Sequence, residues 1–338
     1  MLRIKRAALL LALTLAAGCS GTLTNYGSGP VVTPAPAQTL TVANYLEQTV
    51  VQFSTNASGN VAPSVTIGGA ATTIIGPRAV TRDSTGKLYV ADGDGHAIDV
   101  FAAGASGNVA PTQRIVGANT TIATPLGIGL DGSGNMYVTN GGSDDVLVFA
   151  AAANGNVAPI RTIAGAATLI NGPEGIAVGS AGDFYVELNN AGNSPPIPGN
   201  SILYFAAGAN GNVAPTRDIT GAATTLNNPE GVAVDSSNNI YVTNNSGSVL
   251  VFAAGATGNV APIRSISGSS TTLGTFGARG IALDSAGNIY VGGSICGNIS
   301  QASAVSVFAG GASGNVAPLR TITGALTTLN CNTGISVN

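Results

Sequence analysis

One eleven-residue motif returns six times, in full or in close variants, along this 338-residue chain. Its fullest form reads Phe-Ala-Ala-Gly-Ala-x-Gly-Asn-Val-Ala-Pro, and in every copy a Phe stands six residues before the second Gly. Self-similarity at a period near 48 residues is typical of a repeat architecture, in which each copy is one structural unit. The second Gly of the motif stands at Gly59, Gly107, Gly155, Gly211, Gly258 and Gly314.

Each repeat divides into four short strand signals, as the copy that begins at Pro229 illustrates. The segments "GVAVD", "NIYVTN" and "SVLVFAA" are apolar or alternating, and turn residues separate the first two. The fourth signal, "VAPIRSI", contains a Pro, which cannot donate to a ladder and therefore favours an edge strand. Four antiparallel strands of this kind predict a propeller blade. We expect the repeated Phe to pack between blades and the Gly-Asn pair to form a tight hairpin turn.

The composition agrees with a turn-rich β protein. Charged residues make up 8% of the chain, against about 25% in an average globular protein. Long surface helices need many charged residues on their wet face, so few are expected here. The 48 Gly residues suit numerous tight turns, and the 44% of hydrophobic residues can fill a large core.

The segments "PEGIAV", "PEGVAVDSSNNIYVTN" and "RGIALDSAGNIYV" resemble NHL repeats, a family of β-propeller blades. The resemblance covers nearly all of residues 40–338. It implies the propeller fold but leaves the function open, because propellers carry out many unrelated functions.

The two ends of the chain set the number of blades. The segment that follows residue 38 has the second, third and fourth strands of a blade, whereas the C-terminal "NTGISVN" has a first strand alone. Residues 39–338 are therefore predicted to form an all-β, six-bladed β-propeller of four-stranded antiparallel blades. Its C-terminal strand completes the N-terminal blade and closes the ring. Complete units begin near Pro77, Pro125, Pro173, Pro229 and Gly277.

The N-terminus reads as a targeting segment. Residues 1–18 have a basic start and an apolar run too short to span a bilayer, as in a signal peptide. "LAAGC" resembles the lipobox of bacterial lipoproteins, which implies cleavage before Cys19 and lipid on its thiol. Residues 19–38 form a Gly/Ser/Pro-rich linker. With Ser20 after the Cys, the resemblance implies a lipid-anchored protein of the bacterial cell envelope, in the outer membrane, on its periplasmic side or at the surface.

The charge of the chain argues against one class of partner. Without the leader, nine basic residues face 15 acidic ones, for a net charge near −6. Nucleic-acid binding needs a basic patch to neutralise phosphates, so neither DNA nor RNA is expected as a partner.

Two insertions lengthen the loops between second and third strands, at residues 187–201 and 292–304. Long loops on a rigid scaffold often carry binding, although a surface loop can also drift without function. Cys296 lies in the second insertion, and Cys331 lies just before the closing strand. Outside the cytoplasm two such thiols usually oxidise, so we predict a Cys296–Cys331 disulfide.

The residue before the Gly of each first strand is expected to line the mouth of the central channel. The last residue of several second strands, Asn44 among them, should add polar groups to form a mixed-charge cup. The cup is either a site for a polar ligand or cation, or a solvated mouth whose Glu and Arg pair with one another. The predicted ring is Arg78, Leu126, Glu174, Glu230, Arg279 and Thr333. The candidate ligand-binding residues are Arg78, Asp92, Asn140, Glu174, Glu230, Asn244 and Arg279.

These residues favour a binding or scaffold propeller that recognises an envelope protein, peptide or glycan through its loop-rich face. The alternative is a calcium-dependent lactonase or hydrolase of the propeller class, in which Glu174 and Glu230 with Asn140 and Asn244 would supply oxygen ligands. A zinc lyase of this fold needs several His, and the chain has only His96. We assign no residue a catalytic or metal-binding role and expect no cofactor, with calcium open, since residues 92–96 look like part of a calcium loop.

Overall fold

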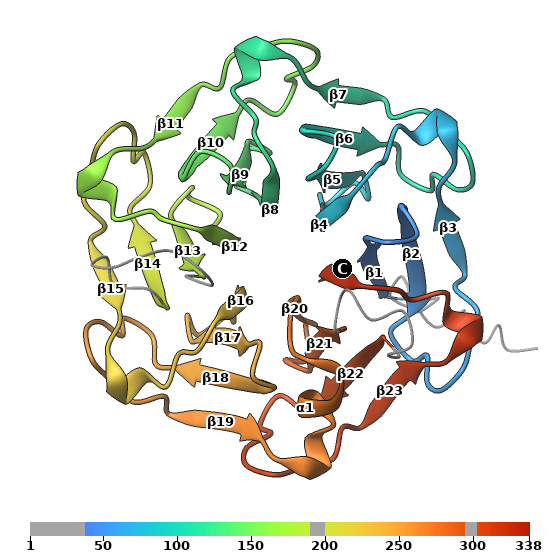
Figure 1. The fold of residues 1–338 in the computed structure, drawn as a ribbon, viewed down its shortest axis with the longest axis vertical. Helices are drawn as coiled ribbons and strands as arrows, with labels where there is room; N and C mark the ends of the chain where they lie inside the picture. Colours follow the sequence, from blue (N-terminus) through green and yellow to red (C-terminus); the bar gives the residue numbers. More distant parts are fainter. Residues whose placement is uncertain (1–37, 190–199, 295–302) are drawn as a thin grey trace, which may run out of the picture. The chain divides into compact units, whose positions relative to one another are not determined.

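The computed structural model describes residues 38–189, 200–294 and 303–338, and these form six four-stranded antiparallel sheets. Figure 1 shows the sheets arranged radially, with the first strand of each nearest the centre. The prediction of an all-β, six-bladed propeller is confirmed.

The blades follow the chain in order. Blade 1 consists of β1 (Thr39–Asn44), β2 (Thr49–Ser54) and β3 (Val65–Ile67), completed by β24 (Asn332–Val337). The strands of blades 2 to 4 are β4 (Pro77–Arg82), β5 (Leu88–Asp92), β6 (Ala97–Phe101), β7 (Gln113–Ile115), β8 (Pro125–Leu130), β9 (Met136–Asn140), β10 (Asp145–Phe149), β11 (Arg161–Ile163), β12 (Pro173–Val178), β13 (Phe184–Leu188), β14 (Ser201–Phe205) and β15 (Arg217–Ile219). Blades 5 and 6 contain β16 (Pro229–Val234), β17 (Ile240–Asn244), β18 (Ser248–Phe252), β19 (Arg264–Ser267), β20 (Ile281–Leu283), β21 (Ile289–Gly293), β22 (Ala304–Phe308) and β23 (Arg320–Thr323).

A short 3-10 turn follows the fourth strand of every blade and leads into the next blade. After the fifth turn, a four-residue helix, α1 (Leu273–Phe276), stands before β20. The turns are η1 (Ala70–Thr72), η2 (Ala118–Thr120), η3 (Ala166–Thr168), η4 (Ala222–Thr224), η5 (Ser269–Thr271) and η6 (Ala325–Thr327).

The core lies between neighbouring blades. Phe184 and Phe205 of blade 4, for example, pack against Tyr137 and Val146 of blade 3. The six repeated Phe side chains are at most 1% exposed, so the prediction that they pack between blades is confirmed. Burial of this kind is the main favourable term in folding, at about 25 cal/mol per Å² of apolar surface.

The Gly-Asn pair of the motif does more than turn the chain. The predicted tight hairpin is absent between β6 and β7, because β6 ends at Phe101 and β7 begins only at Gln113. Gly107 has the left-handed φ of +74° that Gly allows, and its N–H donates to the Thr66 carbonyl of the preceding blade at 2.7 Å. Asn108 Oδ1 accepts from the N–H of Ala71, also at 2.7 Å. The motif is therefore a latch between blades, and the Val-Ala-Pro segment precedes the fourth strand.

The same latch closes the ring. The Gly59 N–H donates to the Thr321 carbonyl at 2.7 Å, and Asn60 Oδ1 accepts from the Leu326 N–H at 2.7 Å. Strand β24 pairs antiparallel with β1, in a register that places Ile335 opposite Val42. The prediction that the C-terminal strand completes the first blade is confirmed.

Candidate ligand-binding site

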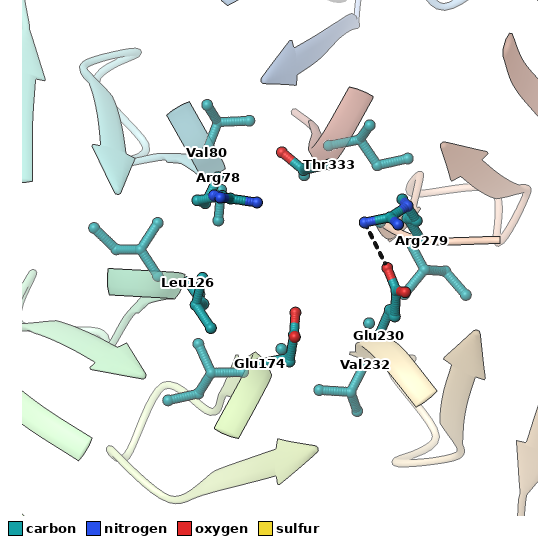
Figure 2. Close-up of a pocket in the computed structure, with 18 residues that line it drawn as sticks. Arg78, Val80, Leu126, Glu174, Glu230, Val232, Arg279 and Thr333 are labelled. Atoms are coloured by element: carbon teal, nitrogen blue, oxygen red, sulfur yellow. Dashed lines mark ion pairs between the residues drawn. The ribbon is translucent and has the colours of Figure 1, made fainter. Parts of the chain in front are cut away.

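The six residues predicted to ring the channel mouth come together in the structure. They line a cavity of about 330 Å³ on the side where the first strands begin. In Figure 2 these side chains extend toward the opening from all six blades, five of them from inner strands and Arg279 from two residues before β20. Below them, one branched aliphatic residue from each blade forms a narrower apolar ring, which we call the collar. The collar consists of Val80, Ile128, Ile176, Val232, Ile281 and Ile335.

Both arginines of the mouth already have an acidic partner. Arg279 Nη1 lies 3.1 Å from Glu230 Oε2, and its Nε donates to the Ser294 carbonyl at 3.0 Å. Arg78 Nη2 lies 3.6 Å from Asp94 Oδ1, and its guanidinium stacks on the Tyr45 ring at 3.9 Å. Each cation is thus neutralised beside the cavity.

Glu174 is the carboxylate left over. Across the described residues its side chain has no hydrogen-bond or ion-pair partner, and Figure 2 shows it directed into the opening. Burial raises its pKa, and the nearby charges of Arg279 and Arg78 lower the pKa in part. Burial also raises the pKa of Glu230 to about 7, against the effect of Arg279. Three acidic groups, Glu174, Glu230 and Asp94, thus stand beside the two arginines of the mouth.

A third carboxyl group stands behind this pair. Sequence analysis assigned Glu187 to an inserted loop, but the structure places it on β13 with no exposed surface. Its Oε2 accepts from the Gly175 N–H at 2.9 Å, and its Oε1 has no partner among the described residues. Burial raises the pKa of Glu187 well above its ordinary value, and Glu174 adds to the shift. Thr139 holds the equivalent place in blade 3. The change from "YVTN" to "YVEL" in the sequence was therefore the signal that could have identified Glu187 as a residue near the channel.

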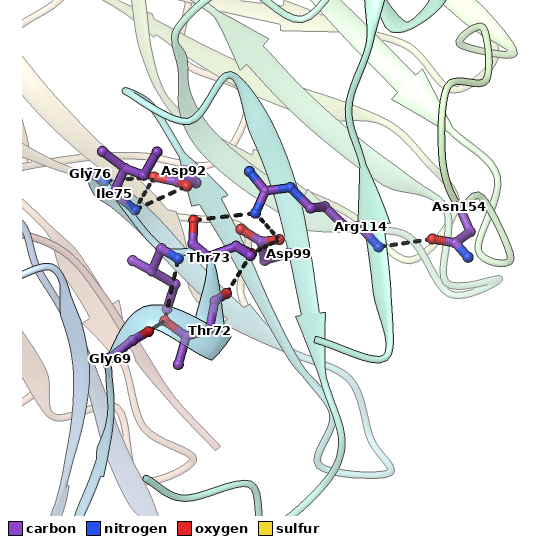
Figure 3. Close-up of polar contacts among 10 residues, drawn as sticks. Gly69, Thr72, Thr73, Ile75, Gly76, Asp92, Asp99, Arg114 and Asn154 are labelled. Carbon is purple, nitrogen blue, oxygen red and sulfur yellow. Dashed lines mark hydrogen bonds and ion pairs between the residues drawn. The ribbon is translucent and has the colours of Figure 1, made fainter. Parts of the chain in front are cut away.

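The second-strand residues do not join the ring. Asp92 accepts from the N–H groups of Ile75 and Gly76, as Figure 3 shows, and it is fully buried. Asn140 and Asn244 bind the backbone of the connections entering their own blades. Asn44 does the same in blade 1. The physical reason is that only the innermost strand of a blade faces the channel, while the end of the second strand is covered by that connection. The predicted cup therefore does not form, because Asp92, Asn140 and Asn244 lie away from the channel mouth. The oxygen ligands that the lactonase resemblance implied are separated in the same way.

The residues of the partial calcium loop at 92–96 are likewise bound to other groups of the protein. Asp94 pairs with Arg78 and accepts from the Tyr45 hydroxyl at 2.8 Å. His96 Nδ1 accepts from the Thr124 N–H of the next blade at 2.9 Å. Within residues 38–189, 200–294 and 303–338, no three His, Cys, Asp or Glu side chains stand close enough together to hold a metal ion.

A buried ion pair in blade 2 was not predicted. Arg114 Nη1 lies 3.5 Å from Asp99 Oδ1, and the Asp99 side chain has no exposed surface (Figure 3). Burial raises the pKa of Asp99 to about 7, although Arg114 lowers it in part. The equivalent positions of blade 3 hold Leu147 and Thr162, which face each other across the same two strands.

Several predicted features lie outside the described residues: the signal peptide at 1–18, the linker with Cys19, most of both insertions, and Cys296. Cys331 is buried and disulfide-bonded. Its pairing with Cys296 stays a prediction. In the part of the chain that the structure describes, no helix is long and apolar enough to cross a membrane.

Comparison with known proteins agrees with this architecture. A family model of the NHL repeat matches residues 226–252. A protein of unknown function from Bacteroides caccae is similar in structure, with a TM-score of 0.64 at 9% identity over 89% of this chain and 98% of that one. A functionally unknown protein from Desulfotomaculum acetoxidans has a TM-score of 0.55 at 13% identity with the same coverage.

A chain from the nidogen/laminin complex is also similar, with a TM-score of 0.55 at 12% identity over 89% of this chain and 98% of that one. At such identities these likenesses show the fold alone. No curated protein matches the sequence. The chain is thus a six-bladed β-propeller in which residues 226–252 match the NHL repeat.

Proposed function

We propose that this propeller is a binding module that takes a cationic side chain, Lys or Arg, of a protein or peptide. The side chain enters the channel mouth described above, which we call the loop-side mouth because the loops between second and third strands lie on the same side. The observation that carries the proposal is the unpaired carboxylate of Glu174, which faces a cavity of about 330 Å³. Because Arg279 and Arg78 each pair with another acid, Glu174 is the acid of the mouth that remains for a cation. Glu174 is partly buried, and a carboxylate withdrawn from water gains from a partner of opposite charge.

Recognition at this depth suits one extended side chain better than a flat protein surface. The collar bounds the mouth from below with apolar side chains, so the charged end of an entering side chain would stop above the collar, at the level of Glu174. Small sites of this kind are typically apolar with a few well-placed polar groups.

A matched pair of peptides tests the proposal by calorimetry on the purified chain. Gly-Gly-Lys-Gly-Gly is expected to bind, and its norleucine analogue, which lacks the charge, is expected to bind at least tenfold more weakly. Glu174→Gln should remove this preference, because it removes the charge and keeps the shape. Glu47→Gln, which changes an exposed glutamate on the same side of the ring, is the control and should leave the preference intact. Equal binding of both peptides would contradict the proposal.

We also propose that lipid on Cys19 anchors the propeller at the bacterial cell envelope. The support is the "LAAGC" segment after a basic and apolar leader. Multiple acyl chains hold a protein at a membrane far more stably than one chain does. In a bacterial host, radiolabelled palmitate is expected to enter the full chain and to be lost in Cys19→Ser. Label that persists in this variant would contradict the anchor, and Cys331→Ser serves as a control that keeps Cys19.

A further inference from the structure

Blade 4 breaks the repeat at three positions that meet in space. In blades 2, 3, 5 and 6 the turn between the first and second strands begins with an Asp. The Oδ2 of this Asp accepts a hydrogen bond from the hydroxyl of the second-strand Tyr. In blade 4, Gly179 stands at that position and the acid has moved to Asp183. A Cβ at position 179 would lie 2.3 Å from Asp183 Oδ1, so a side chain there would displace this carboxylate from its observed place.

The third change places an aromatic ring beside the displaced acid. Tyr204 on β14 occupies the place of Val148 in blade 3 and lies opposite Tyr185 in the sheet. The two rings are 4.8 Å apart between centroids, tilted by 49°. The Tyr204 hydroxyl donates to Asp183 Oδ2 at 3.2 Å. Tyr204 thus offers a partly exposed ring beside this carboxylate, whereas Tyr185 next to it is only 7% exposed.

Arg217 completes the cluster. Like Arg161, Arg264 and Arg320, it donates to the second-strand Tyr hydroxyl of its own blade, at 3.0 Å to Tyr185. It differs in that its guanidinium also lies on the Tyr204 ring, 3.8 Å from the centroid, whereas Arg161 and Arg264 donate to backbone carbonyls of the following blade. No hydrogen bond from it to the next blade occurs among the described residues, and its buried Nε has no partner there. Its Nη1 also has no hydrogen-bond partner among the described residues and remains available as a donor.

This cluster opens into a second cavity, of about 960 Å³, at the turn-side end of the channel. The collar separates it from the loop-side mouth, and Asp235 and Asn238 of blade 5 form its far side. Cavities of roughly 300–1,000 Å³ are the usual size for small-ligand sites. Two acids, Asp183 and Asp235, and two bases, Arg82 and Arg217, line the cavity and balance in charge, so the site suits a neutral ligand.

We propose that this turn-side cavity binds a neutral saccharide against Tyr185, Tyr204 and Arg217. Sugar hydroxyls both donate and accept, which matches an Asp acceptor beside an Arg donor. The apolar face of a sugar ring packs well on aromatic side chains, which supply rigid contact area with a polar edge. The site is distinct from the loop-side mouth and does not depend on Glu174.

The test is an array of neutral oligosaccharides, including glucose and N-acetylglucosamine oligomers, followed by calorimetry with the strongest ligand. Tyr204→Val installs the residue of blade 3, and we expect at least a tenfold loss of affinity with little change in melting temperature. The triple variant Gly179→Asp/Asp183→Asn/Tyr204→Val, which restores the repeat, should abolish binding while the ring folds normally.

Two controls separate this site from the rest of the molecule. Tyr89→Phe, at the position of Tyr185 in blade 2, and Glu174→Gln, at the opposite mouth, should both leave saccharide affinity unchanged. The proposal is overturned if no neutral oligosaccharide binds with a Kd below about 1 mM. It is equally overturned if Tyr204→Val keeps the wild-type affinity, or if Glu174→Gln removes it.

Discussion

Deletion of residues 332–338 is expected to abolish cooperative folding of the whole propeller, not of the first blade alone. The deletion removes β24, the innermost strand of blade 1, and with it the pairing to β1 and the collar residue Ile335. Blades 6 and 1 would then lose their shared core, in which Ile335 packs with Val42 and Tyr290. Because a ring of repeats depends on contacts between neighbours, one missing strand opens two interfaces.

The expected loss is on the order of 5 kcal/mol or more, comparable with the entire stability of many domains. Urea unfolding followed by circular dichroism measures it. Deletion of Asn338 alone is the matched control, since this residue adds only its own hydrogen bonds to Thr39, one of them 3.2 Å long. The control should lose about 1 kcal/mol. A cooperative transition of the truncated chain within about 1 kcal/mol of the full chain would contradict the prediction.

The free energy of unfolding is expected to fall as the pH rises from about 4 to 8. Burial raises the pKa of Asp99 from 3.8 to about 7, that of Glu230 from 4.5 to about 7 and that of Asp145 from 3.8 to about 6. The folded state therefore holds protons that the unfolded state has released. Stability from these groups is complete below their unfolded pKa and is lost as the pH rises through their folded pKa. For Asp99 alone the loss is on the order of 4 kcal/mol.

Two other carboxyl groups have the opposite effect on the free energy of unfolding, and they limit stability at low pH. The pKa values of Asp83 and Asp235 are lowered, because hydrogen bonds to their carboxylates outweigh burial, which raises them. Their contribution is present above the unfolded pKa near 3.8 and is lost as the pH falls further. Maximum stability is therefore expected in mildly acidic solution.

Asp99→Leu/Arg114→Thr tests the assignment, because it gives blade 2 the residues that face each other in blade 3. Replacing a buried ion pair by a packed apolar pair is often neutral or stabilising by about 1–4 kcal/mol. We expect higher stability at pH 8 and a shallower decline with pH. Glu187→Thr should flatten the curve too, whereas Glu47→Gln, an exposed control, should leave it unchanged. A stability that rises between pH 4 and 8 would refute the prediction.

The fold was predictable because its signals are local and repeated. Alternating apolar residues and turn residues recur in every copy, and the unpaired "NTGISVN" at the C-terminus indicated how the ring closes. The channel ring was also predictable, since the residue before the Gly of each inner strand has the same place in every blade. The four charged members, Arg78, Glu174, Glu230 and Arg279, indeed come together.

The contacts between blades were not predictable from one repeat. Asn108 looked like a turn residue, yet its oxygen binds a backbone N–H 37 residues earlier in the chain. Asn140 and Asp92 looked like channel residues because strand ends were treated as equivalent, whatever their distance from the axis. The blade 4 cluster needs three substitutions to meet across a sheet, and neither Gly179 nor Tyr204 is unusual when considered alone.

Because β24 completes the first blade, the blade whose strands are made first can be completed only after all the others. Thr39 and Asn338 meet in the finished blade but are 299 residues apart in the chain. At a synthesis rate of about 5–20 residues per second, roughly 15–60 s pass between them. During that time β1 has an open inner edge, and its sequence "TLTVAN" contains neither charge nor Pro to discourage pairing with another chain. The blade made first is thus the last to be protected, which favours keeping β1 unpaired with other chains until β24 has been made.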